Sequence, residues 1–155
     1  MHTPFGTVYA ANLTPDAATG LGQWSADDFW QALHNGRARD GRLLTPAFPY
    51  TAYTRVPRAD ADALWAYLRS LPAVARATPP QQLHWGVGCR PALMVWRAAF
   101  FRPGALTDAP GASAEWLRGR ELVEGLAHCQ SCHATRNVLG GPTGANRGAV
   151  MPDGR

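Results

Sequence analysis

The sequence contains no lysine, since all 15 of its basic residues are arginine. Charged residues make up only 17% of the 155 residues, and the formal net charge of +4 arises without any run of basic side chains. Clustered positive charge is the usual signature of a nucleic-acid interface, so we expect no nucleic-acid partner. The hydrophobic content of 46% is typical of a folded protein rather than a disordered one.

Cysteine and long apolar runs are also scarce. Only Cys89, Cys129 and Cys132 are present, and the last two belong to the motif described below. Cys89 therefore has no internal disulfide partner, and we expect it to be a small buried apolar residue. Residues 43–54 are uncharged but contain two prolines and are too short to span a bilayer. Residues 1–20 lack the basic start and apolar core of a signal peptide.

One short stretch, Cys129-Gln130-Ser131-Cys132-His133, carries the chemistry of the chain. Cys-x-x-Cys-His is the attachment motif of a c-type haem. Two thiols at this spacing form thioethers with the two vinyl groups of the porphyrin, and the histidine that follows is placed as an iron ligand. The sequence therefore predicts covalent haem c held by Cys129 and Cys132, with His133 as the metal ligand.

Two other interpretations of this motif remain open. His128, Cys129, Cys132 and His133 are four candidate zinc ligands, although structural zinc usually takes a second ligand pair from a distant segment, which the sequence lacks. A thiol redox motif would cap a helix after a strand in a βαβ unit, and no such unit is visible.

Helix signals divide the chain into helical and loop stretches. A capping-box pattern at Ser25 and Asp28 predicts a helix to about Asn35, which Gly36 ends. Apolar residues spaced by three and four predict a second helix over residues 58–70. We expect a short helix over 91–101 and a fourth, capped by Ser113, that runs to about residue 128. The apolar faces expected for the second and fourth helices are Leu64, Tyr67, Leu68 and Leu71, and Trp116, Leu122, Val123 and Leu126.

The remaining stretches have the composition of loops or linkers. Residues 1–22 and 37–57 are rich in turn residues or broken by prolines, and residues 72–90 have the Pro, Ala and Gly content of a linker. No stretch gives a convincing strand signal. We therefore predict an all-α fold.

The order of these features resembles the multihaem cytochrome c subunits of membrane-bound periplasmic dehydrogenases. The likeness covers most of the chain. It rests on several stretches: Asn12-Leu13-Thr14-Pro15-Asp16, Thr19-Gly20-Leu21-Gly22, Pro46-Ala47-Phe48-Pro49-Tyr50, Ala66-Tyr67-Leu68, Leu122-Val123-Glu124-Gly125-Leu126, and His128 through His133 with Arg136-Asn137. One departure is Phe48, which stands where many relatives carry the methionine that supplies the sixth iron ligand.

The resemblance implies that this chain is a fragment of a longer multidomain protein. Residues 1–76 look like the C-terminal part of a first cytochrome c-like domain without a haem motif. Residues 77–110 form a linker with a short helix, and residues 111–155 look like the N-terminal part of a second cytochrome c domain that carries the motif.

The resemblance also implies a function without bond chemistry on a substrate. The chain would be an electron-transfer subunit, passing electrons from a dehydrogenase catalytic subunit of quinoprotein, flavoprotein or molybdenum type toward quinone or an oxidase. It would work in the periplasm or at the periplasmic face of the inner membrane, with membrane association only through missing segments or its partner. Arg136 would pair with a haem propionate. The alternative is a non-haem zinc-binding or docking fragment.

Overall fold

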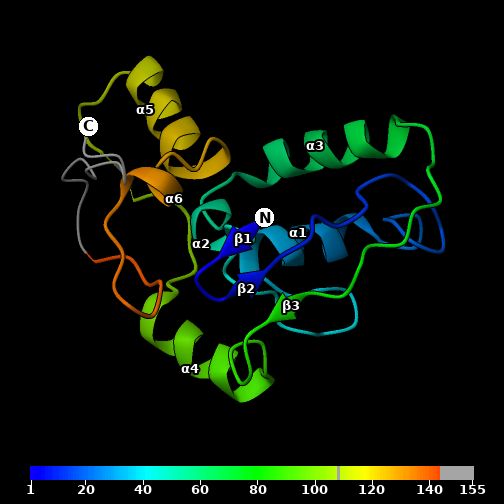
Figure 1. Ribbon diagram of the computed structural model, residues 1–155. Helices are drawn as coiled ribbons and strands as arrows, with labels where there is room; N and C mark the ends of the chain where they lie inside the picture. The colour runs from blue at the N-terminus through cyan, green and yellow to red at the C-terminus, as the bar shows by residue number, and fades with distance from the viewer. Residues whose placement is uncertain (108, 144–155) are drawn as a thin grey trace.

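The computed structural model describes residues 1–107 and 109–143. The described chain is mostly helical, as predicted (Figure 1). Its elements, in order, are β1 (His2–Thr3), β2 (Gly6–Thr7), α1 (Ala26–Asn35), α2 (Tyr50–Tyr53), α3 (Arg58–Ser70), β3 (Gln82–Leu83), α4 (Arg90–Phe100), α5 (Ala114–Glu121), the π-helix η1 (Leu122–Leu126) and α6 (Gln130–His133). None of the described helices combines the length and the apolar character that crossing a bilayer requires.

Local signals set the ends of α1. The Ser25 hydroxyl accepts a hydrogen bond from the Asp28 amide at 3.0 Å, and the Asp28 carboxylate accepts one from the Ser25 amide at 2.9 Å. This reciprocal pair is the predicted capping box, and it satisfies two helix-end donors. At the other end Gly36 adopts φ 57°, ψ 38°, the left-handed conformation that glycine tolerates because it has no Cβ.

A small sheet is present that was not predicted from the sequence. Its order is β1-β2-β3, both pairs are antiparallel, and Gly6 pairs with Thr3 on one side and Leu83 on the other. Each strand has only two residues, which is too short for an alternating pattern to appear. The prediction of no strand was therefore wrong for the segments 2–7 and 82–83, although the helical majority is confirmed.

The hydrophobic core lies where α1 and α3 pack against the loop between them. Its buried members are Leu21, Phe29, Leu33, Val56, Ala61 and Leu68. The extent of α3, residues 58–70, is confirmed, and so is most of its predicted apolar face: Leu68 is buried, and Leu64 and Leu71 pack against the core. Tyr67 is the exception, since it is 61% exposed. The predicted loop 37–57 also contains a helical turn, α2, whose Tyr50 is fully buried.

The linker region contains α4 and an exposed thiol. The predicted helix 91–101 is confirmed as α4, with Leu93 buried and Phe101 buried just beyond its end. Cys89 is exposed, contrary to the prediction, and its Sγ lies 3.0 Å from the Gly86 carbonyl oxygen to which it donates. The extended chain around residues 74–78 lies along the N-terminal loop, since the Asn12 side-chain amide donates to the Val74 carbonyl at 2.8 Å.

The fourth predicted helix is interrupted. Ser113 caps α5 as predicted, through a 3.3 Å hydrogen bond from the Trp116 amide, but α5 ends at Glu121 and a π-helical turn follows. Of the predicted apolar face, Leu126 packs against the core of the first part of the chain, residues 1–76. Trp116, Leu122 and Val123 are 54%, 40% and 46% exposed, so this side of the segment faces solvent rather than protein.

Candidate haem-attachment site

The attachment motif occupies a single helical turn at the end of the α5–η1 segment. Cys129 caps this turn, α6, and its carbonyl oxygen accepts hydrogen bonds from the amides of Cys132 at 3.2 Å and His133 at 3.0 Å. Residues three and four apart on a helix project from the same face. The turn therefore brings the two thiols and the imidazole to one side, which is what the Cys-x-x-Cys-His spacing predicts.

All three of these side chains belong to exposed residues. Cys129 and Cys132 are free thiols, and both are exposed. His133 is exposed as well, and its ring forms no hydrogen bond with any residue in the described ranges. Nothing in the described part of the chain therefore competes with a cofactor for these sulfur and nitrogen atoms.

Arg136 holds the loop that follows the motif. Its guanidinium donates to the Gly140 carbonyl at 2.7 Å and to the Ser131 carbonyl at 3.0 Å. Arg136 and Pro142 also form an isolated β-bridge. A guanidinium carries five N–H donors, so these two bonds leave others for a carboxylate. The pairing of Arg136 with a propionate stays a prediction, and the structure adds a bracing role.

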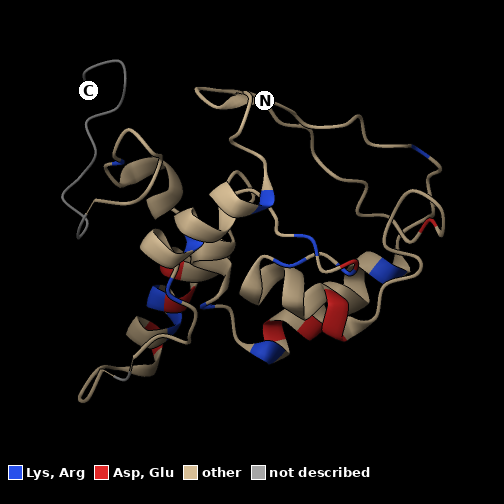
Figure 2. Ribbon diagram, turned by 90° about the horizontal axis from the view of Figure 1, so that it is seen from below, with Lys and Arg blue, Asp and Glu red and all other residues tan. Residues whose placement is uncertain are grey.

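The haem-attachment segment, residues 114–133, packs against the first part of the chain. Gly125 is buried, and a Cβ at that position would lie 3.5 Å from the Val56 side chain. Two ion pairs flank this contact, Arg118 to Asp60 at 2.7 Å and Arg55 to Glu124 at 3.6 Å. Figure 2 shows basic and acidic residues interleaved along this segment. The contact thus combines an apolar centre with charged flanks.

Two aromatic rings of the first part of the chain, Phe48 and Tyr53, connect it to the ring of His128, just before the motif. The rings of Phe48 and Tyr53 pack edge to face with centroids 5.4 Å apart, and those of Tyr53 and His128 do the same at 5.4 Å. Burial raises the pKa of the Tyr53 hydroxyl, which fits a ring enclosed by its neighbours. Phe48, the residue at the expected methionine position, is thus connected through Tyr53 to the residue just before Cys129.

No local pattern in the sequence signals this aromatic contact, because its members lie on segments far apart in the chain. Within residues 1–107 and 109–143, no three His, Cys, Asp or Glu side chains gather into a group that could hold a metal ion. The four-ligand zinc interpretation therefore has no ready-made cluster among the described residues.

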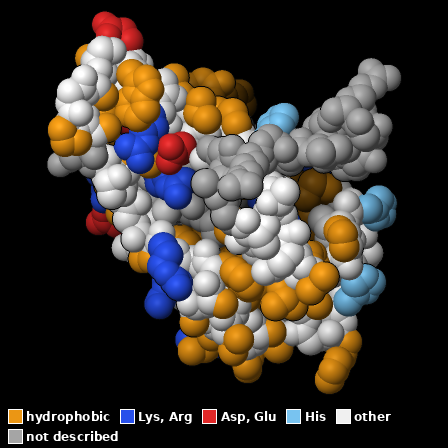
Figure 3. Space-filling model, turned by 90° about the vertical axis from the view of Figure 1, so that its left-hand side faces the viewer, with side chains coloured by type: hydrophobic (Ala, Val, Ile, Leu, Met, Phe, Trp, Pro, Cys, Tyr) orange, Lys and Arg blue, Asp and Glu red, His pale blue; other side chains and the backbone are white. Residues whose placement is uncertain are grey.

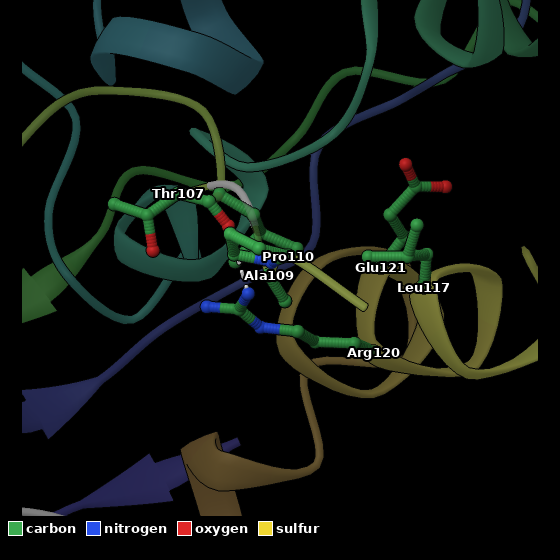
Figure 4. Close-up of a pocket in the computed structure, with 7 residues that line it drawn as sticks. Thr107, Ala109, Pro110, Leu117, Arg120 and Glu121 are labelled. Atoms are coloured by element: carbon green, nitrogen blue, oxygen red, sulfur yellow. Dashed lines mark hydrogen bonds between the residues drawn. The ribbon is translucent and has the colours of Figure 1, made fainter. Parts of the chain in front are cut away.

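Two shallow hollows flank α5. One, of about 360 Å³, is lined by Trp116, Val123 and Glu124 with neighbouring residues. The other, of about 300 Å³, lies between α5 and the linker, where the Arg120 guanidinium donates to the Thr107 carbonyl at 2.9 Å (Figure 4). Figure 3 shows hydrophobic side chains exposed on the same side of the molecule. Apolar surface that the described residues do not cover thus lies along α5 and the start of η1, the segment that precedes the attachment motif in the chain.

No protein-family model matches the chain. Several characterised proteins do. A nicotinate dehydrogenase subunit of Pseudomonas putida is 44% identical over 146 residues, which is 94% of this chain and 12% of that protein. The gluconate 2-dehydrogenase cytochrome c subunit of Pantoea cypripedii is 41% identical over 145 residues, 89% of this chain and 32% of that protein.

A third relative is the cytochrome c subunit of the quinone-type alcohol dehydrogenase of Gluconacetobacter polyoxogenes. It is 35% identical over 160 residues, covering 96% of this chain and 34% of that protein. The chain thus spans about a third or less of the length of these relatives. The resemblance inferred from the sequence is confirmed: over most of its length, the chain is a homologue of cytochrome c subunits of nicotinate, gluconate, alcohol and fructose dehydrogenases.

Proposed function

We propose that the chain is an electron-transfer segment of a c-type cytochrome that serves a dehydrogenase. The observation that carries this proposal is that Cys129, Cys132 and His133 lie in one helical turn and that all three residues are exposed. The cytochrome c names of the relatives imply covalently bound haem c. The chain's own residues fit that group, because both thiols are free and accessible.

Attachment requires no oxidant or reductant. The sulfur of each cysteine adds across one vinyl double bond: a sulfur–carbon bond forms, the S–H bond breaks, and the proton ends on the neighbouring vinyl carbon. Cys129 and Cys132 would each form one such thioether. His133 would supply an imidazole nitrogen to the iron, and Arg136 would offer its remaining N–H groups to a propionate.

Once bound, haem supplies reversible one-electron chemistry, and the protein sets its surroundings. The exposed side chains of Trp116, Leu122 and Val123 support this assignment. Large apolar residues left uncovered in the helical segment that precedes the two thiols are suited to contact the flat apolar part of a porphyrin. A docking fragment without haem would leave the two thiols without a role.

The proposed partner is the catalytic subunit of a dehydrogenase of quinoprotein, flavoprotein or molybdenum type, with electrons passing on toward quinone or an oxidase. The support is that relatives are named as subunits of nicotinate, gluconate, alcohol and fructose dehydrogenases. The site of action would be the periplasm or the periplasmic face of the inner membrane. We also propose the division into residues 1–76, 77–110 and 111–155, of which 144–155 lie outside the described residues.

The test is to export the chain into a periplasm that contains haem-ligation machinery. We expect a strong Soret band, colour that stays with the protein after acid–acetone extraction, and a mass increased by one haem. The double variant Cys129→Ser, Cys132→Ser should lose all three signals. Cys89→Ser is the matched control and should keep them, because Cys89 lies just before α4, away from the motif in sequence and in the fold.

Recovery of the parent chain with both thiols unmodified would contradict the proposal. If that colourless protein contained stoichiometric zinc, the zinc-binding alternative would replace it.

A further inference from the structure

The loop after the attachment motif, residues 135–143, is folded into a closed turn. The Asn137 amide donates to the Gly141 carbonyl at 2.9 Å, and the Gly140 amide donates to the Asn137 carbonyl at 2.8 Å. The Asn137 side-chain oxygen accepts two more hydrogen bonds, from the amides of Leu139 and Gly141, both at 3.0 Å. These bonds hold the turn together, so a contact made by one of its residues places the others as well.

The linker helix α4 contacts this turn with two aromatic side chains. The indole N–H of Trp96 donates to the Leu139 carbonyl at 2.8 Å. Phe100, one helical turn further on, packs on Gly141, which is buried and where a Cβ would overlap the ring. The two rings also pack on each other, with centroids 5.3 Å apart. In Figure 1 the turn, drawn in orange, accordingly lies beside α4.

The N-terminal hairpin contacts the same turn from another segment of the chain. Phe5, between β1 and β2, packs on Gly140, where a Cβ would lie 2.9 Å from the ring. The Phe5 carbonyl accepts a hydrogen bond from the His84 amide at 3.0 Å, which ties the hairpin to the chain just beyond β3. Two adjacent glycines are thus each approached by a ring, and only a residue without a side chain allows so close an approach.

These contacts also bear on Arg136, the residue proposed above to pair with a haem propionate. Its guanidinium donates to the Gly140 carbonyl at 2.7 Å and to the carbonyl of Ser131, inside the motif, at 3.0 Å. The Gly140 carbonyl thus sets where the guanidinium lies, and the residues on either side of Gly140 are those that Trp96 and Phe100 contact. A guanidinium is a rigid planar fork, so the bonds it has already made fix the direction of its remaining N–H groups.

We infer that two residues of α4, Trp96 and Phe100, are positioning residues for Arg136 in the haem-loaded protein. They hold the turn whose Gly140 carbonyl directs the guanidinium toward a propionate, and Phe5 holds it from the hairpin. This inference rests on the proposed function and deepens it, because it names the residues behind the Arg136 contact. It concerns the folded, loaded protein and not the attachment step. It gives α4, in the predicted linker, a part in the haem site of the domain that follows.

The readout is the midpoint potential of the haem. Ferric haem carries one more positive charge than ferrous haem, so a cation held at the propionate disfavours the ferric form and raises the potential. Parent and variants are exported with the haem-ligation machinery. Potentials are measured on soluble protein that carries one haem and whose helical circular dichroism matches the parent.

The variants separate the turn from the cation. Trp96→Phe keeps a ring but removes the N–H donor, and Gly141→Ala places a methyl group against Phe100. Arg136→Gln removes the cation itself, alone and together with Trp96→Phe. Trp85→Phe is the matched control, because it is the same substitution in the linker at a side chain that is 99% exposed.

We expect Arg136→Gln to raise the ferric-to-ferrous ratio at a fixed electrode potential about tenfold, a shift of about 59 mV for one electron. Trp96→Phe and Gly141→Ala should each raise the ratio about threefold, because the guanidinium keeps its charge but loses its fixed direction. Trp85→Phe should match the parent. The double variant should match Arg136→Gln alone, since residues that act through one group are not additive.

A potential equal to that of the parent in Trp96→Phe and Gly141→Ala would overturn the inference, because the turn would then not place Arg136. An equal shift from Trp96→Phe with and without Arg136→Gln would overturn it as well, since α4 would then act on the haem by another route. So would an Arg136→Gln variant with the potential of the parent. Failure of the proposed function is a different result, in which the parent chain itself carries no haem.

Discussion

Replacing Gly36 by alanine tests the packing between the end of α1 and Tyr50. Gly36 has φ 57°, and a Cβ there would lie 2.6 Å from two carbon atoms of the Tyr50 ring. Tyr50 is fully buried, so the ring cannot swing into solvent. The left-handed backbone costs alanine about 1 kcal/mol, and the overlap adds about 1–3 kcal/mol. We expect Gly36→Ala to lower the free energy of unfolding by about 2–4 kcal/mol.

Gly41 provides the matched control. Its φ is 76°, and a Cβ there would meet nothing within 4 Å. Gly41→Ala therefore carries only the backbone penalty, about 1 kcal/mol. Any entropy that alanine removes from the unfolded chain is common to both variants. Urea unfolding followed by tryptophan fluorescence measures both. If the two variants lose equal stability, Tyr50 does not pack over Gly36 and the reasoning is refuted.

Further predictions concern a helix cap and charged groups on the surface. Ser25→Ala removes the helix cap and should cost about 1 kcal/mol in urea unfolding at pH 7. Hydrogen bonds from the Ser25 amide and hydroxyl lower the pKa of Asp28, so the stability they contribute is present above the unfolded pKa of about 3.9 and lost as pH falls through the lower folded value. The gap in stability between the parent and Ser25→Ala should therefore narrow in acid, and a constant gap down to low pH would contradict this. Arg118→Met removes the 2.7 Å ion pair with Asp60. Because the Arg118 and Asp60 side chains are 50% and 26% exposed, the loss in free energy of unfolding should be smaller than that of Ser25→Ala and should vanish in high salt. A loss unchanged by salt would show that packing of the Arg118 stem, not its charge, is what matters.

The parts of the fold that could be predicted from the sequence are those with local causes. The bounds of α1 and α3 follow from a cap, a glycine and a periodic apolar face, all within a few residues of each other. The spacing of Cys129, Cys132 and His133 identified the motif, but the helical turn α6 that carries it was not predicted. Each of these signals acts between neighbours in the chain, so a short stretch of sequence contains all the partners.

The parts that could not be predicted depend on partners far apart in the chain. Gly6 pairs with Leu83 in strands of two residues, which are too short to form a pattern. The spacing placed Tyr67 on the buried face together with Leu68, but Tyr67 is exposed and Ala61 is buried instead, because the position of α1 selects the face. The contact of Tyr53 with His128 likewise depends on docking that no local pattern encodes.

The contact between the haem-attachment segment and the first part of the chain has a consequence for the order of folding. Arg118 and Asp60 are separated by 58 residues, whereas the backbone hydrogen bonds of α1 and α3 join residues within one turn. Closing so long a loop costs entropy before its contacts offset that cost, so local helices form ahead of it. During that interval the segment with Cys129 and Cys132 is still undocked. The ring contact between Tyr53 and His128 therefore forms late, together with the docking of this segment.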